Sequence, residues 1–413
     1  MLLLFRDNAP RSITMKYKLI EDRTYTLKSV PIGYDPLDGS EITLSLPNSR
    51  RILLIGSTGS GKTTFLSGLL DRFMLGGGSG FVVDYKGEYN RKYLPLQDHL
   101  KKFLLPNEQP KGLAIKSYYP YFLQMITKAK LEHDEELIQF SFEDMTAEDF
   151  FTIMGIDDSK QKDLVYKIWY KIMQEGAFSI GEIEKILEED SELHPSSKKR
   201  FIGQLKVAMD RGLIGSSFPI PEFHNRLNDS EIVNLNLHGM SAFASTNNPA
   251  TAYAAVFLRK LYNYKTRNII TKSIHLGVVI DELNKFCPHI GEPPSKAEIL
   301  KLMDLSRHTK ISMFMGTQDI RRIPPTILGQ SEYVFISPMM RLDDVAEIFK
   351  MVLPAEYDNP QTFKSKIASI LSTAMKSRRS KREKVWLFLN KISGEYFIVK
   401  PAVPVSYLKQ EGE

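Results

Sequence analysis

The stretch Arg51-Ile-Leu-Leu-Ile-Gly-Ser-Thr-Gly-Ser-Gly-Lys-Thr63 determines the fold of this chain. It joins a short apolar run, residues 51–55, to a glycine-rich turn, and the apolar residues that follow at 64–70 have helical spacing. A continuous apolar run of this length is typical of a strand buried inside a parallel sheet. The stretch therefore predicts a strand, a loop and a helix in that order.

The glycine-rich turn has the spacing of a phosphate-binding loop, with four residues between the first glycine and Gly-Lys-Thr. In such a loop the backbone N–H groups surround phosphate oxygens, the lysine contacts the β- and γ-phosphates, and the threonine hydroxyl binds Mg²⁺. A glycine-rich turn that binds no nucleotide would not require the flanking strand and helix. We therefore predict ATP and Mg²⁺ as ligands of Gly56, Ser57, Thr58, Gly59, Ser60, Gly61, Lys62, Thr63 and Thr64.

A pair of acidic residues follows a second apolar run. Asp281 and Glu282 come directly after Leu276-Gly-Val-Val-Ile280. Asp281 is predicted to hold Mg²⁺ through its water shell, and Glu282 to act as the general base toward the attacking water. Two acids after a strand can also simply begin a helix. The phosphate-binding loop upstream favours the catalytic interpretation.

A polar pair, Thr317 and Gln318, ends the next apolar run at 311–315. The position of Gln318 indicates a side chain that senses the γ-phosphate or orients the water. The alternative is an ordinary polar residue at the end of a strand.

Alternation of strand-like and helix-like segments predicts an α/β fold with a mostly parallel sheet. Strand signals are nearly absent between Asp144 and Leu213, where we expect short amphipathic helices with Asp144 or Thr146, and Ser179, as N-caps. The predicted divisions are a short β lead-in (1–48), a first core part (49–143), an all-helical insertion (144–228), a second core part (229–345) and a closing helix and β segment (346–413).

Composition sets weaker limits. Hydrophobic residues make up 42% of the 413 residues and charged residues 25%, as in globular proteins. The formal net charge is +6, and the densest basic run is 376–384. This run is either a solvated loop or a contact with nucleic-acid phosphates through Lys376, Arg378, Arg379, Lys381 and Arg382. No signal peptide and no membrane-spanning stretch are apparent, so we expect a cytoplasmic protein.

The order of these motifs resembles the HerA/FtsK superfamily of ring-forming, DNA-pumping ATPases. The matching residues are 32–35 and 42–44, the loop at 56–64, Val83-Asp-Tyr-Lys-Gly-Glu-Tyr89, Val279-Ile-Asp-Glu282, and Gly316-Thr-Gln318 followed by 323–324. The element containing Asp84 and Glu88 points toward the HerA-like branch. The resemblance implies a RecA-like core, a homo-oligomer that forms a hexameric ring, ATP at the subunit interfaces and double-stranded DNA in the centre.

Such rings complete each site with an arginine from the neighbouring subunit. The resemblance places this arginine on the helix before the glutamine strand, where Arg307 lies, with Arg321, Arg322 and Arg341 as rivals. HerA proteins begin with a larger β-barrel than the β lead-in before this loop. That departure favours a minimal pump of a virus or conjugative element over a repair role.

Three functional hypotheses follow from the sequence. The first is an ATP-driven DNA translocase, for packaging or transfer of DNA. The second is a conjugation or secretion motor that moves protein substrates and needs membrane partners. The third is a non-motor switch in which ATP binding orders the helical insertion, although an intact Glu282 argues against it.

Overall fold

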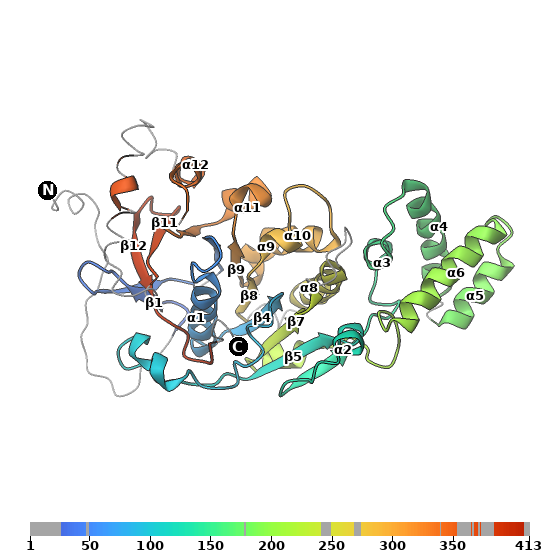
Figure 1. Ribbon diagram of the computed structural model, residues 1–413, viewed down its shortest axis with the longest axis horizontal. Coiled ribbons are helices and arrows are strands. Elements are labelled where there is room, and N and C mark those ends of the chain that lie inside the picture. The colour runs from blue at the N-terminus through green and yellow to red at the C-terminus, as the bar shows by residue number, and fades with distance from the viewer. Residues whose placement is uncertain are drawn as a thin grey trace.

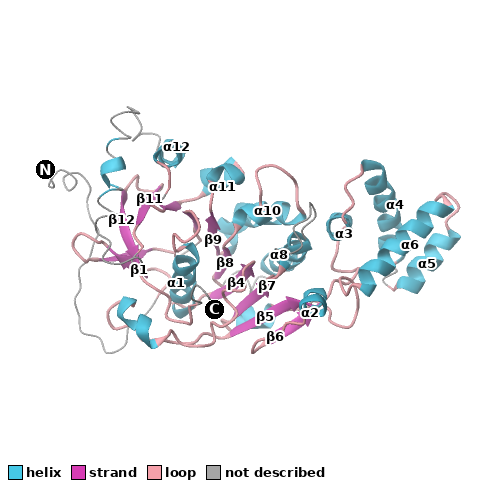
Figure 2. Cartoon of the chain, in the orientation of Figure 1, coloured by secondary structure: helices cyan, strands magenta, loops and turns pink. Residues whose placement is uncertain are grey.

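A sheet of twelve strands is the framework of the molecule. Figure 1 and the secondary-structure view in Figure 2 show how the helices are arranged around it. The computed structural model describes residues 26–46, 49–176, 179–240, 249–267, 274–338, 340–352, 365, 367–370, 372 and 384–408. The basic run 376–384 lies outside the described residues except for its last member, Lys384.

Parallel strands make up most of the sheet, as the apolar runs predict. In spatial order they are β10 (Tyr333–Ile336), β3 (Arg51–Ile55), β9 (Ile311–Thr317), β8 (Leu276–Ile280), β4 (Ser79–Asp84), β7 (Ile232–Asn236), β5 (Ile115–Pro120) and β6 (Glu135–Ile138). The fold class is therefore α/β, and β3, which precedes the glycine-rich loop, lies inside the parallel region.

Antiparallel strands extend the β10 side of the sheet. They are β11 (Trp386–Asn390), β12 (Tyr396–Pro401), β1 (Val30–Tyr34) and β2 (Glu41–Leu44). The β segment that precedes the loop thus joins the same sheet as the two strands nearest the C-terminus, β11 and β12, and Gly33 pairs with Pro401. A Cβ at Gly33 would lie 2.1 Å from the Lys400 carbonyl oxygen, so only glycine permits this close approach.

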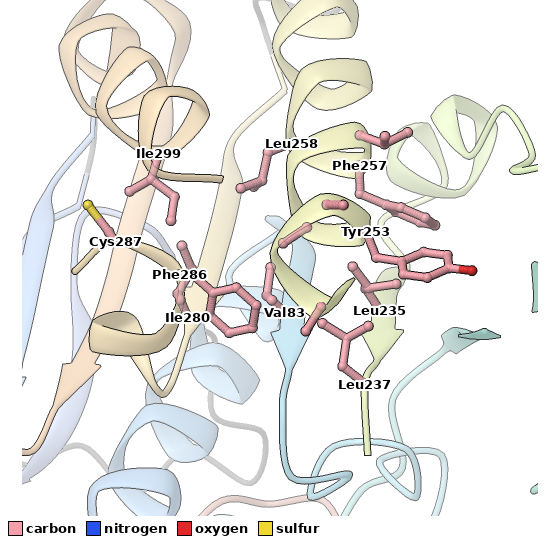
Figure 3. Packing of buried hydrophobic residues seen from close by; sticks show 14 of the residues in the cluster. Val83, Leu235, Leu237, Tyr253, Phe257, Leu258, Ile280, Phe286, Cys287 and Ile299 are labelled. Carbon is pink, nitrogen blue, oxygen red and sulfur yellow. The ribbon is translucent and has the colours of Figure 1, made fainter. Parts of the chain in front are cut away.

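The two faces of the sheet carry different helices because successive side chains of a strand point to opposite sides. Ile52 and Leu54 pack with the apolar side of α1 (Lys62–Leu75). Leu53 and Ile55 belong to the core that includes α8 (Pro249–Arg267) and α10 (Pro294–Thr309), two helices that pack against each other. Figure 3 shows strand and helix side chains of this second core meeting, with Tyr253, Phe257 and Leu258 on α8.

A group of helices projects from one end of the sheet (Figure 1). It consists of α3 (Ala147–Met154), α4 (Ser159–Glu175), α5 (Ile180–Glu189) and α6 (Pro195–Asp210). Capping boxes start α3 at Thr146 and α5 at Ser179. Asp144 does not cap a helix; its carboxylate instead contacts Lys260 Nζ of α8 at 2.9 Å, which ties the helical group to the core.

Shorter elements complete the chain. They are α2 (Tyr121–Thr127), α7 (His224–Asn228), α9 (Leu283–Phe286), α11 (Pro325–Gln330), α12 (Leu342–Val352) and the 3₁₀ turns η1 (Asp98–Phe103) and η4 (Ile320–Arg322). Within the described ranges, no helix has the length and apolarity needed to cross a bilayer.

The second half of α1 carries two buried charges that hold distant segments. Asp71 and Lys92 form an ion pair with side chains 0% and 1% exposed, and Lys92 Nζ also donates to Ser67 Oγ at 2.7 Å and Ser406 Oγ at 2.8 Å. Arg72 binds both carboxylate oxygens of Glu108, at 2.8 and 2.7 Å. These contacts join α1 to residues 92–108 and 403–406, a long-range connection that no local pattern predicts.

Candidate nucleotide-binding and hydrolysis site

The glycine-rich loop connects β3 to α1 and places its lysine at the start of the helix. Gly61 has φ +92°, a left-handed conformation that favours glycine, and Lys62 is the first residue of α1. Lys62 Nζ curls back over the loop and donates to the Gly56 carbonyl oxygen at 2.8 Å. The Ser60 hydroxyl is buried and has no hydrogen-bond partner within the described part of the chain. The loop therefore encloses polar groups suited to phosphate oxygens.

Strand register brings the predicted acidic and polar residues to this loop. Ile55 pairs with Thr317 in β9, and Ile280 of β8 pairs with Met315. Because the carboxyl ends of parallel strands meet at one edge, the residues after each strand converge there. Gly316 permits the close approach, since a Cβ at that position would lie 2.6 Å from the Asp281 carbonyl oxygen.

Asp281 and Thr63 contact each other, as expected of two Mg²⁺ ligands. The Thr63 hydroxyl donates a short hydrogen bond to Asp281 Oδ2, and Asp281 Oδ1 is buried without a hydrogen-bond partner among the described residues. Burial raises the pKa of Asp281 to about 6, although the hydrogen bond from Thr63 acts in the opposite direction. A hydroxyl beside a carboxylate oxygen that lacks a partner fits Mg²⁺, which takes few protein ligands and completes its shell with water and phosphate.

Lys62 is a buried cation that interacts electrostatically with Asp281 and Glu282. Burial lowers the pKa of Lys62, and the neighbouring carboxylates of Asp281 and Glu282 offset part of that effect. A buried ammonium close to two carboxylates suits a polyanion that carries a bound cation.

Glu282 lies beside Gln318, as a general base and its orienting group would. The Gln318 amide Nε2 donates to Glu282 Oε1 at 3.1 Å and to Oε2 at 3.2 Å. The Gln318 carbonyl oxygen accepts from Thr58 Oγ1 of the loop at 3.4 Å. Gln318 therefore spans the distance between the loop and the predicted base.

The sequence did not single out Lys86, which also reaches this site. Its Nζ lies 2.6 Å from Glu282 Oε1, and their side chains are 39% and 3% exposed. Lys86 belongs to the Asp-Tyr-Lys-Gly-Glu-Tyr element after β4, the strand beside β8. The sequence element at 84–89 drew attention to this region. The contact between Lys86 and Glu282 arises because β4 pairs with β8.

Asp84 explains the shape of that element. Its Oδ1 accepts from the backbone N–H groups of Lys86, Gly87 and Glu88 at 3.2, 2.8 and 3.0 Å, and its Oδ2 accepts from Tyr89 N at 2.9 Å. Burial raises the pKa of Asp84, and these backbone hydrogen bonds act in the opposite direction. Asp84 thus orders the turn that carries Lys86 and Glu88.

The arginine candidates fall at two edges of the sheet. Arg307 lies in the last turn of α10, which leads into the amino end of β9, opposite the loop edge; its side chain is outside the described part of the structure. Arg321 and Arg322 follow β9 at the loop edge, are 58% and 72% exposed, and approach Asp319 at 3.1 and 3.8 Å. Arg341 is exposed. Lys376, Arg378, Arg379, Lys381 and Arg382 lie outside the described residues.

Comparison with known proteins agrees with this geometry. A sequence profile described as the central domain of helicase HerA matches residues 30–283, more than half of the chain. The chain belongs to the HerA family. It is a P-loop ATPase of the HerA/FtsK type, and the resemblance seen in the sequence motifs is confirmed. No curated protein matches the chain in sequence.

Solved structures of the same type share the fold. VirB4 of Thermoanaerobacter pseudethanolicus is 14% identical with a TM-score of 0.57, covering 92% of this chain and 97% of the solved chain. The bacterial conjugative coupling protein TrwBdeltaN70 is 11% identical with a TM-score of 0.50, covering 89% of this chain and 88% of the solved chain. The genome packaging NTPase B204 from Sulfolobus turreted icosahedral virus 2 is 10% identical, with a TM-score of 0.36 and coverage of 86% and 98%. At these identities the first two similarities show a shared RecA-like fold and do not identify a shared function. With a TM-score of 0.36, the third supports no conclusion about this chain.

Proposed function

We propose that this HerA-family member hydrolyses ATP to move double-stranded DNA, as a ring-shaped homo-oligomer that the family resemblance predicts to be hexameric. The observation that supports this best is the convergence of Lys62, the Thr63–Asp281 pair and the Glu282–Gln318 pair at one sheet edge. This cluster would supply the phosphate-binding, metal-binding and water-activating groups for phosphoryl transfer to water.

The hydrolytic roles follow from the contacts. Lys62 would exchange the Gly56 carbonyl for the β- and γ-phosphates, and the N–H groups of 56–64 would surround the phosphate chain. Thr63 and Asp281 would hold Mg²⁺, which neutralises developing charge on the phosphate oxygens. Glu282 would accept the proton of the attacking water while Gln318 orients that water.

An arginine from a neighbouring subunit would complete the site. Arg307 lies at the edge of the sheet opposite its own loop, so it would have to act on the site of another copy. Arg321 and Arg322 lie at the loop edge and remain the alternatives.

The decisive measurement is steady-state ATP hydrolysis with and without long duplex DNA, at low and moderate salt. We expect stimulation by DNA that falls as salt rises, because phosphate contacts release counterions. Lys62→Ala, which removes the phosphate-binding ammonium, is the inactive control. Hydrolysis that is indifferent to DNA would overturn the DNA motor, and the absence of hydrolysis would leave the nucleotide switch.

The basic run 376–384 offers a second test of DNA binding. If Lys376, Arg378, Arg379, Lys381 and Arg382 contact phosphates, replacing all of them with Gln should flatten the salt dependence of the DNA dissociation constant by roughly one logarithmic unit of slope per lost contact. Filter binding across a salt series measures this slope. An unchanged slope would show that the run 376–384 is a solvated loop that does not contact DNA.

A conjugation or secretion motor is the second candidate function. The fold does not separate it from a DNA motor, because TrwB, a protein described as a conjugative coupling protein, shares the same core. The two functions separate experimentally, because a secretion motor should hydrolyse ATP in response to membrane partners and not to duplex DNA.

A further inference from the structure

Both carboxylate oxygens of Glu282 already accept hydrogen bonds from side chains. Lys86 Nζ lies 2.6 Å from Oε1, and Gln318 Nε2 lies 3.1 and 3.2 Å from Oε1 and Oε2. A carboxylate oxygen has two lone pairs, so Oε1 is fully occupied. In this arrangement one lone-pair site of Glu282, on Oε2, is left for the water that the hydrolytic role requires it to contact.

Lys86 reaches Glu282 from a backbone turn that is fixed in place. The Asp84 carboxylate binds four successive N–H groups, from Lys86 to Tyr89, at 2.8–3.2 Å. Gly87 within the turn has φ +69°, and a Cβ there would lie 2.8 Å from His238 Cβ, so the turn also requires glycine. The turn is thus built to hold a side chain over the end of β8.

The two partners of this contact differ in exposure. Glu282 is 3% exposed, whereas Lys86 is 39% exposed. Lys86 can therefore move toward another anion and keep its ammonium in water, while Glu282 retains its two contacts with Gln318. Breaking the contact leaves the buried Glu282 carboxylate with the neutral amide of Gln318 as its hydrogen-bond donor, so a competing anion must attract Lys86 strongly enough to offset that cost.

The ammonium groups of Lys86 and Lys62 face the same polar cluster. After burial, which has the largest effect, Asp281 and Glu282 raise the pKa of Lys62 and Lys86 lowers it. The carboxylates of Asp281 and Glu282 likewise act on Lys86, whose pKa is raised overall despite its partial burial. A triphosphate at the loop would place several negative oxygens among these groups and would compete with Glu282 for Lys86.

We propose that Lys86 is a positioning residue that restrains Glu282, and that ATP hydrolysis requires the Lys86–Glu282 ion pair to break. This inference rests on the proposed function, since it assigns Glu282 as the base. It deepens that function by naming a contact that lowers the fraction of ATP-bound molecules in which Glu282 is free to act. Basal hydrolysis is then limited by the fraction of molecules in which Glu282 is released.

The test compares Lys86→Ala with Lys86→Arg in the full chain. We expect Lys86→Ala to raise the basal kcat for ATP by about threefold or more, the range of a partly exposed ion pair, and to reduce the fold-stimulation by DNA. Lys86→Arg keeps the positive charge and should stay within about twofold of the unaltered chain. Lys285→Ala is the matched control, because Lys285 is exposed and lies three residues after Glu282; it should leave kcat unchanged.

A rise in rate separates restraint from a merely structural role, since damage to the turn would lower the rate. An unchanged or lower kcat in Lys86→Ala, with the melting temperature and ATP binding preserved, would overturn the restraint. Glu282→Gln tests the proposed function itself. If that variant hydrolyses ATP normally, or if neither the unaltered chain nor Lys86→Ala hydrolyses ATP, the proposed function fails and the restraint fails with it.

Discussion

The two halves of helix α1 each border a cluster of buried charges, and the clusters differ in how completely their hydrogen bonds are made. At the start of the helix, Asp281 Oδ1 and Ser60 Oγ have no partner among the described residues. In the second half, both oxygens of Asp71 are bonded, Oδ1 to Lys92 and Oδ2 to the N–H and hydroxyl of Ser406 at 2.8 and 2.7 Å.

Burial by itself therefore does not distinguish a functional charge from a structural one in this molecule. Asp71 is 0% exposed and Asp281 is 4% exposed. A buried polar group without a partner costs folding free energy, so it persists where a ligand completes it. A cluster whose hydrogen bonds are all made, such as that of Asp71, holds distant segments together. We therefore expect substitutions at the Asp281 cluster to lower activity and substitutions at the Asp71 cluster to lower stability.

The largest effect is expected at the incomplete cluster, from Glu282→Gln. Loss of the base should lower kcat by about 10²- to 10⁴-fold while ATP still binds. The melting temperature should change little, because Gln can still bond to Gln318. Single-turnover hydrolysis and filter retention of labelled ATP measure the two effects. Hydrolysis at the normal rate would show that Glu282 is not the base.

Substitutions in the Asp71 cluster should lower the free energy of unfolding and leave ATP hydrolysis unchanged. Asp71→Ala leaves the buried Lys92 ammonium without its counter-ion and is expected to cost about 3–5 kcal/mol of unfolding free energy. Urea denaturation measures the loss, and kcat per folded molecule should be retained at low temperature. A loss below about 1 kcal/mol would contradict the structural role of this pair.

Asp281→Asn should stabilise the metal-free chain. The folded-state pKa of Asp281, about 6, exceeds its ordinary value of 3.8, so its contribution to stability is present below pH 3.8 and is lost as pH rises through 6. Removing the charge should therefore raise unfolding free energy by about 1–3 kcal/mol at pH 7.5 in EDTA, with no difference near pH 3.5. Hydrolysis should be lost. A destabilised variant at pH 7.5 would show that Asp281 has partners like those of Asp71.

The smallest effect comes from a matched pair of buried serines. Ser67→Ala removes one of the partners of Lys92 and should cost about 1–2 kcal/mol. Ser60→Ala removes a hydroxyl without a partner among the described residues and should be neutral or slightly stabilising without nucleotide. Thermal melts of both variants, without and with ATP, provide the comparison. Equal losses without ATP would remove the distinction between the clusters.

The fold was predictable where strands are buried on both faces. The runs at 51–55, 276–280 and 333–336 have the same bounds as β3, β8 and β10, because a short continuous apolar run between turn signals suits a strand that is buried on both faces. Strands β5 and β6 were not predicted. Their sequences, Ile-Lys-Ser-Tyr-Tyr-Pro and Glu-Glu-Leu-Ile, include polar residues and resemble loops until pairing is known.

The site was predictable as far as the residues at strand ends. The positions of Asp281, Glu282 and Gln318 after apolar runs indicated that they meet the loop, because parallel strands bring their carboxyl ends together. The Lys86–Glu282 contact joins residues on neighbouring strands whose pairing the sequence does not state. The same holds for Arg72 with Glu108, since tertiary packing alone selects that partner.

The bond between Asp71 and Ser406 also bears on how the chain is made. The two residues are separated by 335 positions, and Leu96 and Lys111 likewise donate to the Val405 carbonyl. During synthesis the ribosome must add more than three hundred residues before the Asp71 carboxylate receives its backbone donor. The packing around the second half of α1 is therefore completed only by residues made near the end of synthesis, and long-range contacts of this kind slow folding.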